Sequence, residues 1–490
     1  MMHIDLLTNI RIWGKKKVDL IVSLGILMYS FYFSVFTITR HNAFQTQLFD
    51  LSIFVQALWN TLQGDVMKVT AHPGVDNFMQ IHFAPSMFLL VPLYAIWTSP
   101  ISLLVIQSVT VASGAWPIYR LSSEHLQNKW MGAAFAYFYL LFPSIQAANL
   151  YDFHGITMAA PLLAWTWFFA KKNRWVAYAI VGIVAIGFRE EAVLVMIVIG
   201  FLMALEKSTR KYGVITIGTC LIWGIVVYAV SFPGVEVDTV RALHFNERLG
   251  LGSSPTEALI TLLQNPNTFW EQVSSPEKLL FIFRLFAPVG FLSIFSLPTL
   301  VIVLPLITFN LLSDYWPMYS PDQAHYNALL APFIVLSASA GAKWLTKYLS
   351  RKTSFDRKFL SVLVIIYVFL LSIGYQSRLA HLPFSPNFSW PDVTERNRVG
   401  VEIARQIPKE ASLSTQDHLA PHTSHRTDLY LFPTENDMDY IFLDENSLDS
   451  FTGDYKVFMK EVFFKTLADP NYIKVIDIDG FILLRRKEIK

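Results

Sequence analysis

Long apolar runs alternate with short polar stretches along residues 1–377. The first run, residues 18–38, is as long as a helix that crosses a bilayer, and it follows the basic stretch RIWGKKK. No small-residue cleavage site comes after it, so the run is predicted to be an uncleaved first helix. Further candidate spans are residues 101–119, 131–147, 156–170, 174–188, 190–205, 213–231, 279–295, 296–312, 326–345 and 359–377. The pattern predicts an α-helical polytopic membrane protein with about eleven transmembrane helices.

The segment HFAPSMFLLVPLYAIW, residues 82–97, decides the orientation of this array. It is apolar but short for a span. If it lies along the outer face, the basic stretches 171–174, 206–211 and 343–358 all fall on the cytoplasmic side with the N-terminus, as the positive-inside rule requires. If it crosses, the first two stretches move outside. The charge pattern therefore favours a segment that does not cross, in a multi-pass protein of the plasma membrane.

After residue 378 the long apolar runs end, and the pattern changes to that of amphipathic helices and short strands. The stretch VTERNRVGVEIARQIP has the period of an amphipathic helix, and YKVFMKEVFFKTLADP is a second predicted helix. Predicted strands are ASLST, DLYLF, DYIFLD, YIKVIDID and FILLRR, with a hairpin turn at Asp479-Gly480 between the last two. We therefore expect two domains: a transmembrane domain, 1–377, whose first loop, 39–100, is outside, and a soluble α/β domain, 378–490, which lies outside by parity.

Composition supports a membrane protein and excludes several classes of site. The chain is 53% hydrophobic and 16% charged, and its 15% aromatic content suits rings that anchor helices at lipid headgroups. A net charge of +2 without a basic, aromatic-interleaved patch argues against nucleic acid as a partner. The single cysteine, Cys220, rules out a disulfide framework. No Walker A loop or HExxH motif occurs, so ATP-driven transport and zinc protease chemistry have no support.

The candidate polar residues of the first outer loop are Asp50, Gln56, Asn60, Asp65, His72, Asp76 and His82. Asp50 lies near the start of the short amphipathic helix LFDLSIFVQALW, where a carboxylate suits the positive helix end. Gln56 and Asn60 follow on the same helix, and His82 opens the turn HFAP. A helix cap is the alternative role for Asp50, and a place at the level of the headgroups is the alternative for His82.

Three further polar clusters stand at the predicted outer ends of helices. NLYDFHG contains Asp152 and His154, GFREEAVL contains Arg189 and Glu190, and SDYWPMYSPDQAHY ends with His325 and Tyr326. Each has a simpler explanation as a polar turn between two spans. Ionisable groups at membrane depth are costly, however, and they tend to face cavities or partners. Because all the clusters fall on one face, the sequence favours an outward-facing polar cavity.

Several of these stretches resemble a known superfamily. FDLSIFVQALWNTLQG, HFAP, NLYDFHG and APHTSHRTDLYLFP are similar to stretches in a family of predicted bacterial and archaeal membrane proteins. That family lies within the GT-C superfamily of polytopic glycosyltransferases, which use lipid-linked sugar donors. The resemblance covers most of the chain. It implies an outer-face active site in which an acidic residue of the first loop acts toward an acceptor.

By position, Asp50 matches that acidic residue and Asp152 matches a second outer one. The chain departs from the pattern of some members, because Leu51 rather than a second acid follows Asp50 and His82 stands where others carry a basic residue. We expect Asp50 and Asp152 to be catalytic. The expected substrate-binding residues are Gln56, Asn60, His82, His154, Arg189, Glu190, His325 and Tyr326.

A divalent metal is a further expectation. On an extended segment, Asp152 and His154 project to the same side, and an Asp–His pair suits Mn²⁺ or Zn²⁺. Glu190 or His82 would have to complete the set. Because two ligands do not make a site, the metal stays open, with Mg²⁺ or Mn²⁺ as the ions of choice for such an enzyme.

These expectations lead to one function and two alternatives. The first is an integral membrane glycosyltransferase that takes a polyprenyl-phosphate-linked sugar donor and a glycan, lipid or protein acceptor. The second is a transporter or flippase-like carrier of a lipid-linked envelope intermediate, and the third is a membrane scaffold whose tail binds a partner. Charges in mid-span would favour transport, but here they stand at helix ends.

Overall fold

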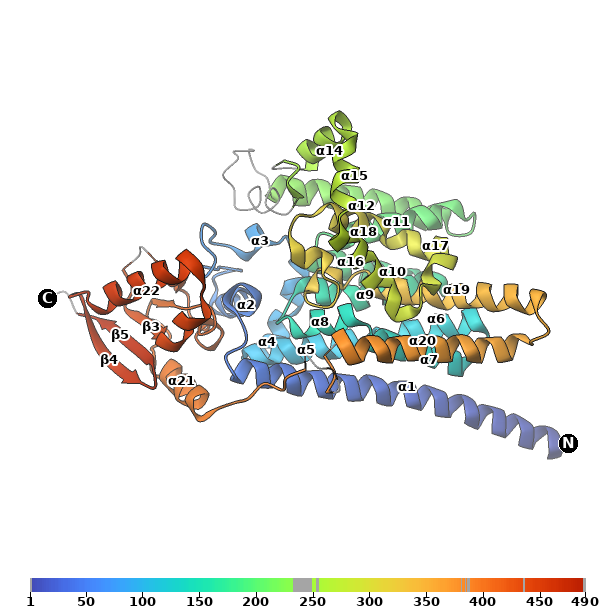
Figure 1. Ribbon diagram of the computed structural model, residues 1–490, viewed down its shortest axis with the longest axis horizontal. Coiled ribbons are helices and arrows are strands. Elements are labelled where there is room, and N and C mark those ends of the chain that lie inside the picture. Colours follow the sequence, from blue (N-terminus) through green and yellow to red (C-terminus); the bar gives the residue numbers. More distant parts are fainter. Residues whose placement is uncertain are drawn as a thin grey trace. The chain divides into compact units, whose positions relative to one another are not determined.

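The computed structural model describes residues 2–231, 249–252, 255–379, 381–383, 385, 388–434 and 437–487. Its helices up to residue 231 are α1 (Met2–Asn42), α2 (Ile53–Gln63), α3 (Phe78–Ile81), α4 (Val91–Ile96), α5 (Pro100–Ser113), α6 (Ala115–Leu126), α7 (Lys129–Leu140), α8 (Pro143–Leu150), α9 (Gly155–Lys171), α10 (Trp175–Phe188), α11 (Ala192–Leu205) and α12 (Arg210–Ser231). The later ones are α14 (Pro255–Gln264), α15 (Pro266–Val273), α16 (Pro276–Phe286), α17 (Leu297–Leu300), α18 (Leu304–Leu312), α19 (Ala331–Lys352), α20 (Arg357–Leu379), α21 (Glu395–Gln406) and α22 (Gly453–Leu467) (Figure 1).

The chain divides into two compact units. One, here called the apolar unit, comprises Met1–Ser34, Phe83–Ser86 and Ile106–Trp390. The other, the loop–tail unit, comprises Val35–His82, Met87–Val105 and Pro391–Lys490. We expected residues 378–490 to form a domain alone, whereas their sheet shares a compact unit with most of the first loop. The boundary at residue 377 stays a prediction.

In the apolar unit, α19 is the central helix. It contacts α6, α7, α9 and α20, and almost every residue from Ala331 to Ala342 is buried. Gly341 is needed there because a Cβ would lie 1.9 Å from the backbone oxygen of Leu292. The other closely packed pairs, α6 with α7, α9 with α10 and α11 with α12, are neighbours in sequence. The unit is therefore a bundle built of helical hairpins around one buried helix.

Among the described residues, four helical stretches are long and apolar enough to cross a membrane: Lys16–Asn42, Pro100–Leu126, Arg210–Ala229 and Arg357–Leu379. The pair α7 and α8, bent by 43°, adds a fifth if it counts as one span. A multi-pass membrane protein is confirmed, but the expected count of eleven helices is not. The segment Pro85–Ile96 is a short apolar helix, and at about 1.5 Å per residue it is too short for a bilayer core of about 30 Å.

The two spans expected over residues 279–312 are wrong as continuous helices. Helix α16 ends at Phe286, and short helical turns and the small helices α17 and α18 follow it. Pro288, Pro298 and Pro305 each open one of these pieces, since proline fits the first turn of a helix but cannot donate a hydrogen bond within it. Proline therefore interrupts an apolar run that hydropathy alone predicts to be transmembrane helix.

The loop–tail unit contains a five-stranded sheet with the order β2-β1-β3-β5-β4. The strands are β1 (Leu413–Thr415), β2 (Leu429–Leu431), β3 (Tyr440–Asp444), β4 (Tyr472–Ile478) and β5 (Phe481–Arg486), and each lies where the sequence predicts one. β1 runs parallel to β2 and β3, whereas β5 is antiparallel to β3 and β4. Asp479 and Gly480 have φ of 52° and 80°, as a tight hairpin turn requires.

One face of this sheet is covered by α22. Met459 and Phe463 of the helix are buried against Ile441, Leu443 and Ile482 of the strands. Figure 1 shows α22 beside β3, β4 and β5. The predicted tail helices and the α/β class of the tail are therefore confirmed.

A buried glutamine ties the first loop to the tail. Gln56 Nε2 donates to the hydroxyl of Thr70 and to the backbone oxygens of Arg426 and Thr427, at 2.9, 3.2 and 2.9 Å. Its Oε1 accepts from the backbone N–H groups of Thr70 and Ala71. Both ends of the amide are therefore used to join segments about 370 residues apart.

We expect Gln56→Leu to destabilise the loop–tail unit by at least about 2 kcal/mol, because each buried backbone group left without its hydrogen bond costs about 1–3 kcal/mol. The measurement is the unfolding temperature of the purified protein, together with the rate at which a protease cleaves residues 39–100. Gln63→Leu, at the exposed end of α2, is the matched control and should change neither.

Buried histidines in the same unit lead us to expect that its stability depends on pH. The His422 ring stacks on His41 and Phe44, with centroids 4.2 and 4.0 Å away, and its Nε2 donates to the His41 backbone oxygen. Burial, with His41 nearby, holds the pKa of His422 well below its usual range. Burial also lowers the pKa of His425, to about 4.

As pH falls below about 6.5, the unfolded chain binds protons at these histidines while the folded unit does not, so stability is lost as pH falls. We expect the unfolding temperature to drop between pH 7.5 and 5.0, and to drop less in His422→Phe. Phe44→Leu weakens the stack without removing a titrating group. This variant should therefore lower the unfolding temperature by the same amount at pH 7.5 and at pH 5.0. An identical pH response in His422→Phe and the parent protein would contradict this assignment.

Candidate functional site

The polar cluster that the sequence predicts at helix ends is partly assembled in the apolar unit. The rings of His154 and His325 stack with centroids 3.7 Å apart and an angle of 16° between their planes. Tyr151 packs against both rings, and Tyr326 lies 4.1 Å from His325. His154 and His325 are both buried. Residues more than 170 positions apart in sequence thus form one aromatic, titratable cluster.

A second buried glutamine shapes the turn that carries Asp152 and His154. Gln107 of α5 donates to the backbone oxygens of Asp152 and Asn149, at 2.6 and 3.3 Å, and its Oε1 accepts from the His154 N–H. His154 Nδ1 contacts the Tyr151 backbone oxygen at 2.8 Å and so donates to it. Asp152 has φ of 53°, in the left-handed region. The segment is therefore a turn and not the extended segment that we expected. The expectation that Asp152 and His154 project to the same side rested on an extended backbone and does not apply.

The glycine of NLYDFHG has a packing role. A Cβ on Gly155 would lie 2.2 Å from the backbone oxygen of Phe188, the last residue of α10. The start of α9 therefore meets the end of α10 without room for a side chain. This close approach sets His154 beside the turn that contains Arg189.

Arg189 and Glu191 form a bidentate ion pair. Arg189 Nε and Nη2 donate to the two carboxylate oxygens of Glu191 at 2.6 and 2.8 Å, and the guanidinium is 3% exposed. Burial alone lowers the pKa of Arg189, but the Glu191 and Glu190 carboxylates and Tyr326 outweigh it and raise that pKa. The guanidinium is thus already balanced by two carboxylates, and Arg189 holds the turn beside Tyr326.

The candidate metal ligands do not come together. Among the described residues, no group of three or more His, Cys, Asp and Glu side chains lies close enough to hold an ion. His154 uses Nδ1 for a backbone contact and one ring face for His325. The set of Asp152, His154 and Glu190 therefore does not fit a divalent metal, and no step is derived through one.

Asp50 lies in the loop–tail unit, in a π-helical turn, Leu48–Ser52, that leads into α2. Single π-helical turns are rare and often occur at functional sites. The Asp417 carboxylate accepts a hydrogen bond from the Leu48 N–H at 2.6 Å. Burial raises the pKa of Asp417, and the negative charge of Asp50 raises it further. A second carboxylate therefore neighbours Asp50, and it comes from the tail rather than from position 51.

The other loop candidates have structural contacts. Gln56 uses its amide to join loop and tail, and Asn60 is buried and donates to the Lys68 backbone oxygen at 2.9 Å. His82 is half-buried at the end of α3, where its ring meets that of Phe78. These contacts give Gln56 and Asn60 a positioning role in the fold.

The sequence analysis missed a group of charged residues in the apolar unit. Lys278 of α16 is 5% exposed, and its ammonium has no hydrogen-bond partner among the residues that the structure describes. It lies 5.3 Å from the ring centre of Tyr319, and the negative charge of Asp314 acts on it without a hydrogen bond. On the same helix, Arg284 lies 3.7 Å from the buried carboxylate of Asp322. Arg284 interrupts the apolar run 279–295, and that interruption was the available signal.

These charges are linked to the histidine cluster through one segment. Tyr319 ends the short turn Trp316–Tyr319, which contacts both α16 and the turn His325–Asn327. The turn His325–Asn327 also contacts α8 and α9, and Tyr151 and His154 lie in the segment between these two helices. The segment 313–327 therefore joins the buried ammonium of Lys278 to the stacked histidines.

Comparison with known proteins agrees with the fold. Residues 40–482 match the family model described as "Predicted membrane protein (DUF2079)". The crystal structure of ArnT from Cupriavidus metallidurans bound to undecaprenyl phosphate is similar, with a TM-score of 0.50, 10% identity, and coverage of 89% of this chain and 93% of that one. The apo state of the same protein gives a TM-score of 0.47 with equal identity and coverage. No curated protein matches the chain.

ArnT is a GT-C glycosyltransferase, so the expected GT-C-like fold is confirmed. At 10% identity the likeness concerns the fold, since one fold hosts many activities. The family match covers most of the sequence, from the end of α1 to β5. The chain therefore belongs to the DUF2079 family of predicted membrane proteins.

Proposed function

We propose that the chain is an integral membrane glycosyltransferase that takes a polyprenyl-phosphate-linked sugar donor at the outer face of the plasma membrane. The observation that carries the proposal is Lys278, a buried ammonium without a hydrogen-bond partner in the described part of the chain. A buried charge is costly unless an opposite charge and hydrogen bonds compensate it. The phosphate of a lipid-linked donor supplies a negative charge and oxygen atoms that accept hydrogen bonds. Similarity in fold to ArnT bound to undecaprenyl phosphate is consistent with such a ligand.

The proposal assigns the chemistry in two separate parts. The acceptor hydroxyl attacks the anomeric carbon of the donor and loses its proton to a carboxylate. The resemblance, and not a position next to Lys278, implies Asp50 for this role. The bond from that carbon to the phosphate oxygen breaks, and the electron pair leaves with the polyprenyl phosphate. Lys278 stabilises the charge that develops on this leaving group.

The remaining candidates take supporting roles. Tyr326, which is partly exposed beside the buried stack of His154 and His325, is the candidate for contact with the sugar. Asp152 is the second candidate carboxylate. Arg189, with Glu190 and Glu191 around it, positions the turn next to Tyr326.

The test is binding and transfer by the purified full-length protein with undecaprenyl phosphate and radiolabelled polyprenyl-phosphate sugars. Lys278→Met should weaken binding of undecaprenyl phosphate roughly tenfold or more, because a charge-assisted contact to phosphate is lost. Asp50→Asn should leave binding unchanged and reduce transfer by about 10²–10⁴-fold, the usual contribution of a general base. Lys358→Met and Asp65→Asn, both at exposed positions, are the matched controls.

Full transfer by Asp50→Asn would remove it from the catalytic role. Unchanged lipid binding by Lys278→Met would remove the phosphate site. Tight lipid binding by the parent protein, without transfer of any sugar tested, would instead favour a carrier of a lipid-linked intermediate.

Orientation is a separate part of the proposal, and it has its own test. We propose that the loop 353–356 is cytoplasmic and that the tail is outside. Cys220 is buried, so single cysteines introduced at exposed positions can be labelled above a low background. In intact cells, an impermeant maleimide should label Thr452→Cys and not Ser354→Cys, and permeabilised cells should label both. Labelling of Ser354→Cys alone in intact cells would reverse the orientation.

A further inference from the structure

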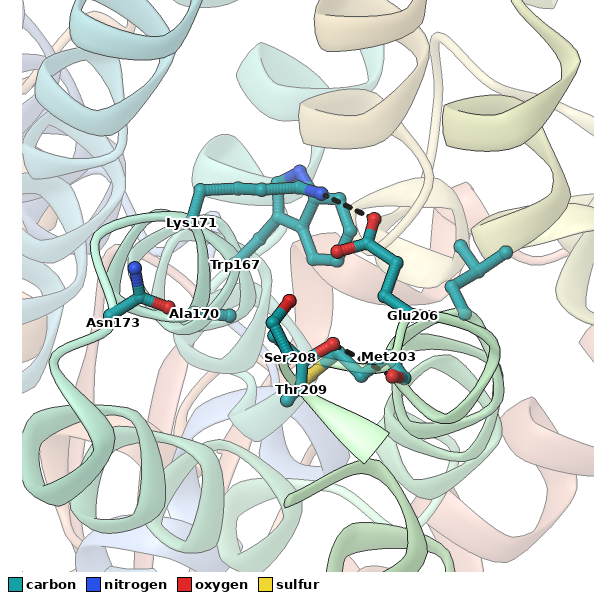
Figure 2. Close-up of a pocket in the computed structure, with 9 residues that line it drawn as sticks. Trp167, Ala170, Lys171, Asn173, Met203, Glu206, Ser208 and Thr209 are labelled. Carbon is teal, nitrogen blue, oxygen red and sulfur yellow. Dashed lines mark hydrogen bonds and ion pairs between the residues drawn. The ribbon is translucent and has the colours of Figure 1, made fainter. Parts of the chain in front are cut away.

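A cavity of about 190 Å³ opens at the C-terminal end of α9, the helix that follows His154. Its walls are the end of α9, the end of α11 and the turn before α12 (Figure 2). The lining residues are Trp167, Ala170, Lys171, Asn173, Leu202, Met203, Glu206, Ser208 and Thr209. His154 precedes the first residue of α9 and Lys171 is its last, so about 25 Å of helix separates the two sites.

The cavity presents charges of both signs. Figure 2 shows the Lys171 side chain extended past Trp167 toward Glu206. The ammonium lies 3.9 Å from the carboxylate, too far for a hydrogen bond, and 4.4 Å from the centre of the indole ring. Both charged side chains are about half-exposed. The pair is loosely held, so each charge can accept another partner.

Hydrogen-bond donors stand on the α12 side of the cavity. Ser208 is exposed and lines the cavity, and α12 begins at Arg210, two residues later. Thr209 donates its hydroxyl to the Met203 backbone oxygen, which fixes the turn. The first N–H groups of a helix have no partner within it and attract anions. This side of the cavity therefore suits a phosphate.

The surroundings place the cavity beside lipid. Phe201 and Leu205 of α11 and Val214 and Ile215 of α12 are exposed apolar side chains. Trp175 and Tyr212 stack with their rings 3.9 Å apart at the starts of α10 and α12. Aromatic rings at the ends of apolar helices mark the level of the headgroups. By the positive-inside rule this end, with KKNR and EKSTRK, faces the cytoplasm.

We propose that this cavity binds the phosphoethanolamine headgroup of a membrane phospholipid. A ligand with only a negative charge would meet the carboxylate of Glu206, and one with only a positive charge would meet the ammonium of Lys171. A zwitterion satisfies both: its phosphate pairs with Lys171, Ser208 and the start of α12, and its ammonium pairs with Glu206. Binding there joins the ends of α9, α11 and α12 and stabilises the bundle. The inference is independent of the proposed transferase activity.

The experiment uses the full-length protein, delipidated in detergent and titrated with palmitoyl-oleoyl phosphatidylethanolamine. The unfolding temperature should rise by about 2 °C or more at saturation. Phosphatidylcholine, whose quaternary ammonium cannot donate to Glu206, and phosphatidylglycerol, which has no ammonium, should each give less than half that shift. Soluble phosphoethanolamine tells the sources apart: a shift with it shows that the headgroup suffices, and a shift with the lipid alone shows that the acyl chains take part.

Variants locate the site. Lys171→Met and Glu206→Gln should each raise the half-maximal lipid concentration roughly tenfold or more. Both positions are about half-exposed, so the variants should unfold near the parent temperature without lipid. Lys207→Met, exposed next to Glu206 but outside the cavity lining, is the control and should respond like the parent. Equal shifts with all three lipids, or a phosphatidylethanolamine response that survives both cavity variants, would overturn the proposal.

Discussion

Buried irregular backbone needs hydrogen-bond partners, and two glutamine side chains provide them in this protein. Gln107 holds the turn of Asp152 and His154, and Gln56 joins the first loop to residues 426 and 427 of the tail. An amide has a donor end and an acceptor end, so each glutamine can form hydrogen bonds with several backbone N–H and C=O groups at once. In an apolar chain, an unsatisfied backbone group is expensive. The turn of Asp152 and His154 and the join between first loop and tail therefore depend on these two amides.

The charged groups follow the same constraint. Arg189 is closed by Glu191, and Arg284 lies near Asp322, so these guanidinium groups are compensated within the protein. Lys278 differs, because no described residue hydrogen-bonds its buried ammonium and Asp314 acts on it only through its charge. Near the end of α9, Lys171 and Glu206 are paired only loosely. Positions where compensation is incomplete are those where an added ligand lowers the free energy most. The two proposed ligand sites rest on this difference.

Local patterns predicted the secondary structure well in the tail and less well in the apolar part. All five strands, both tail helices and the Asp479-Gly480 turn are where alternation and turn residues predict them. Over residues 279–312, hydropathy predicted two spans, and prolines at the starts of short helical pieces break them instead. Hydropathy measures how apolar a window is, but it does not register a missing N–H group, so a broken helix and a span look alike.

The sequence by itself determined the class of the protein. Apolar runs long enough to cross a bilayer predict a helical membrane protein, and strands of alternating apolar and polar residues predict an α/β tail. It also singled out His154, His325 and Arg189 as polar groups at helix ends. Only the tertiary structure decided that His154 stacks on His325, that Asp417 neighbours Asp50, and that Lys278 is buried with no hydrogen bond from any described residue. The reason is physical: residue type and spacing set local conformation, whereas pairing of side chains far apart in sequence depends on how whole helices pack.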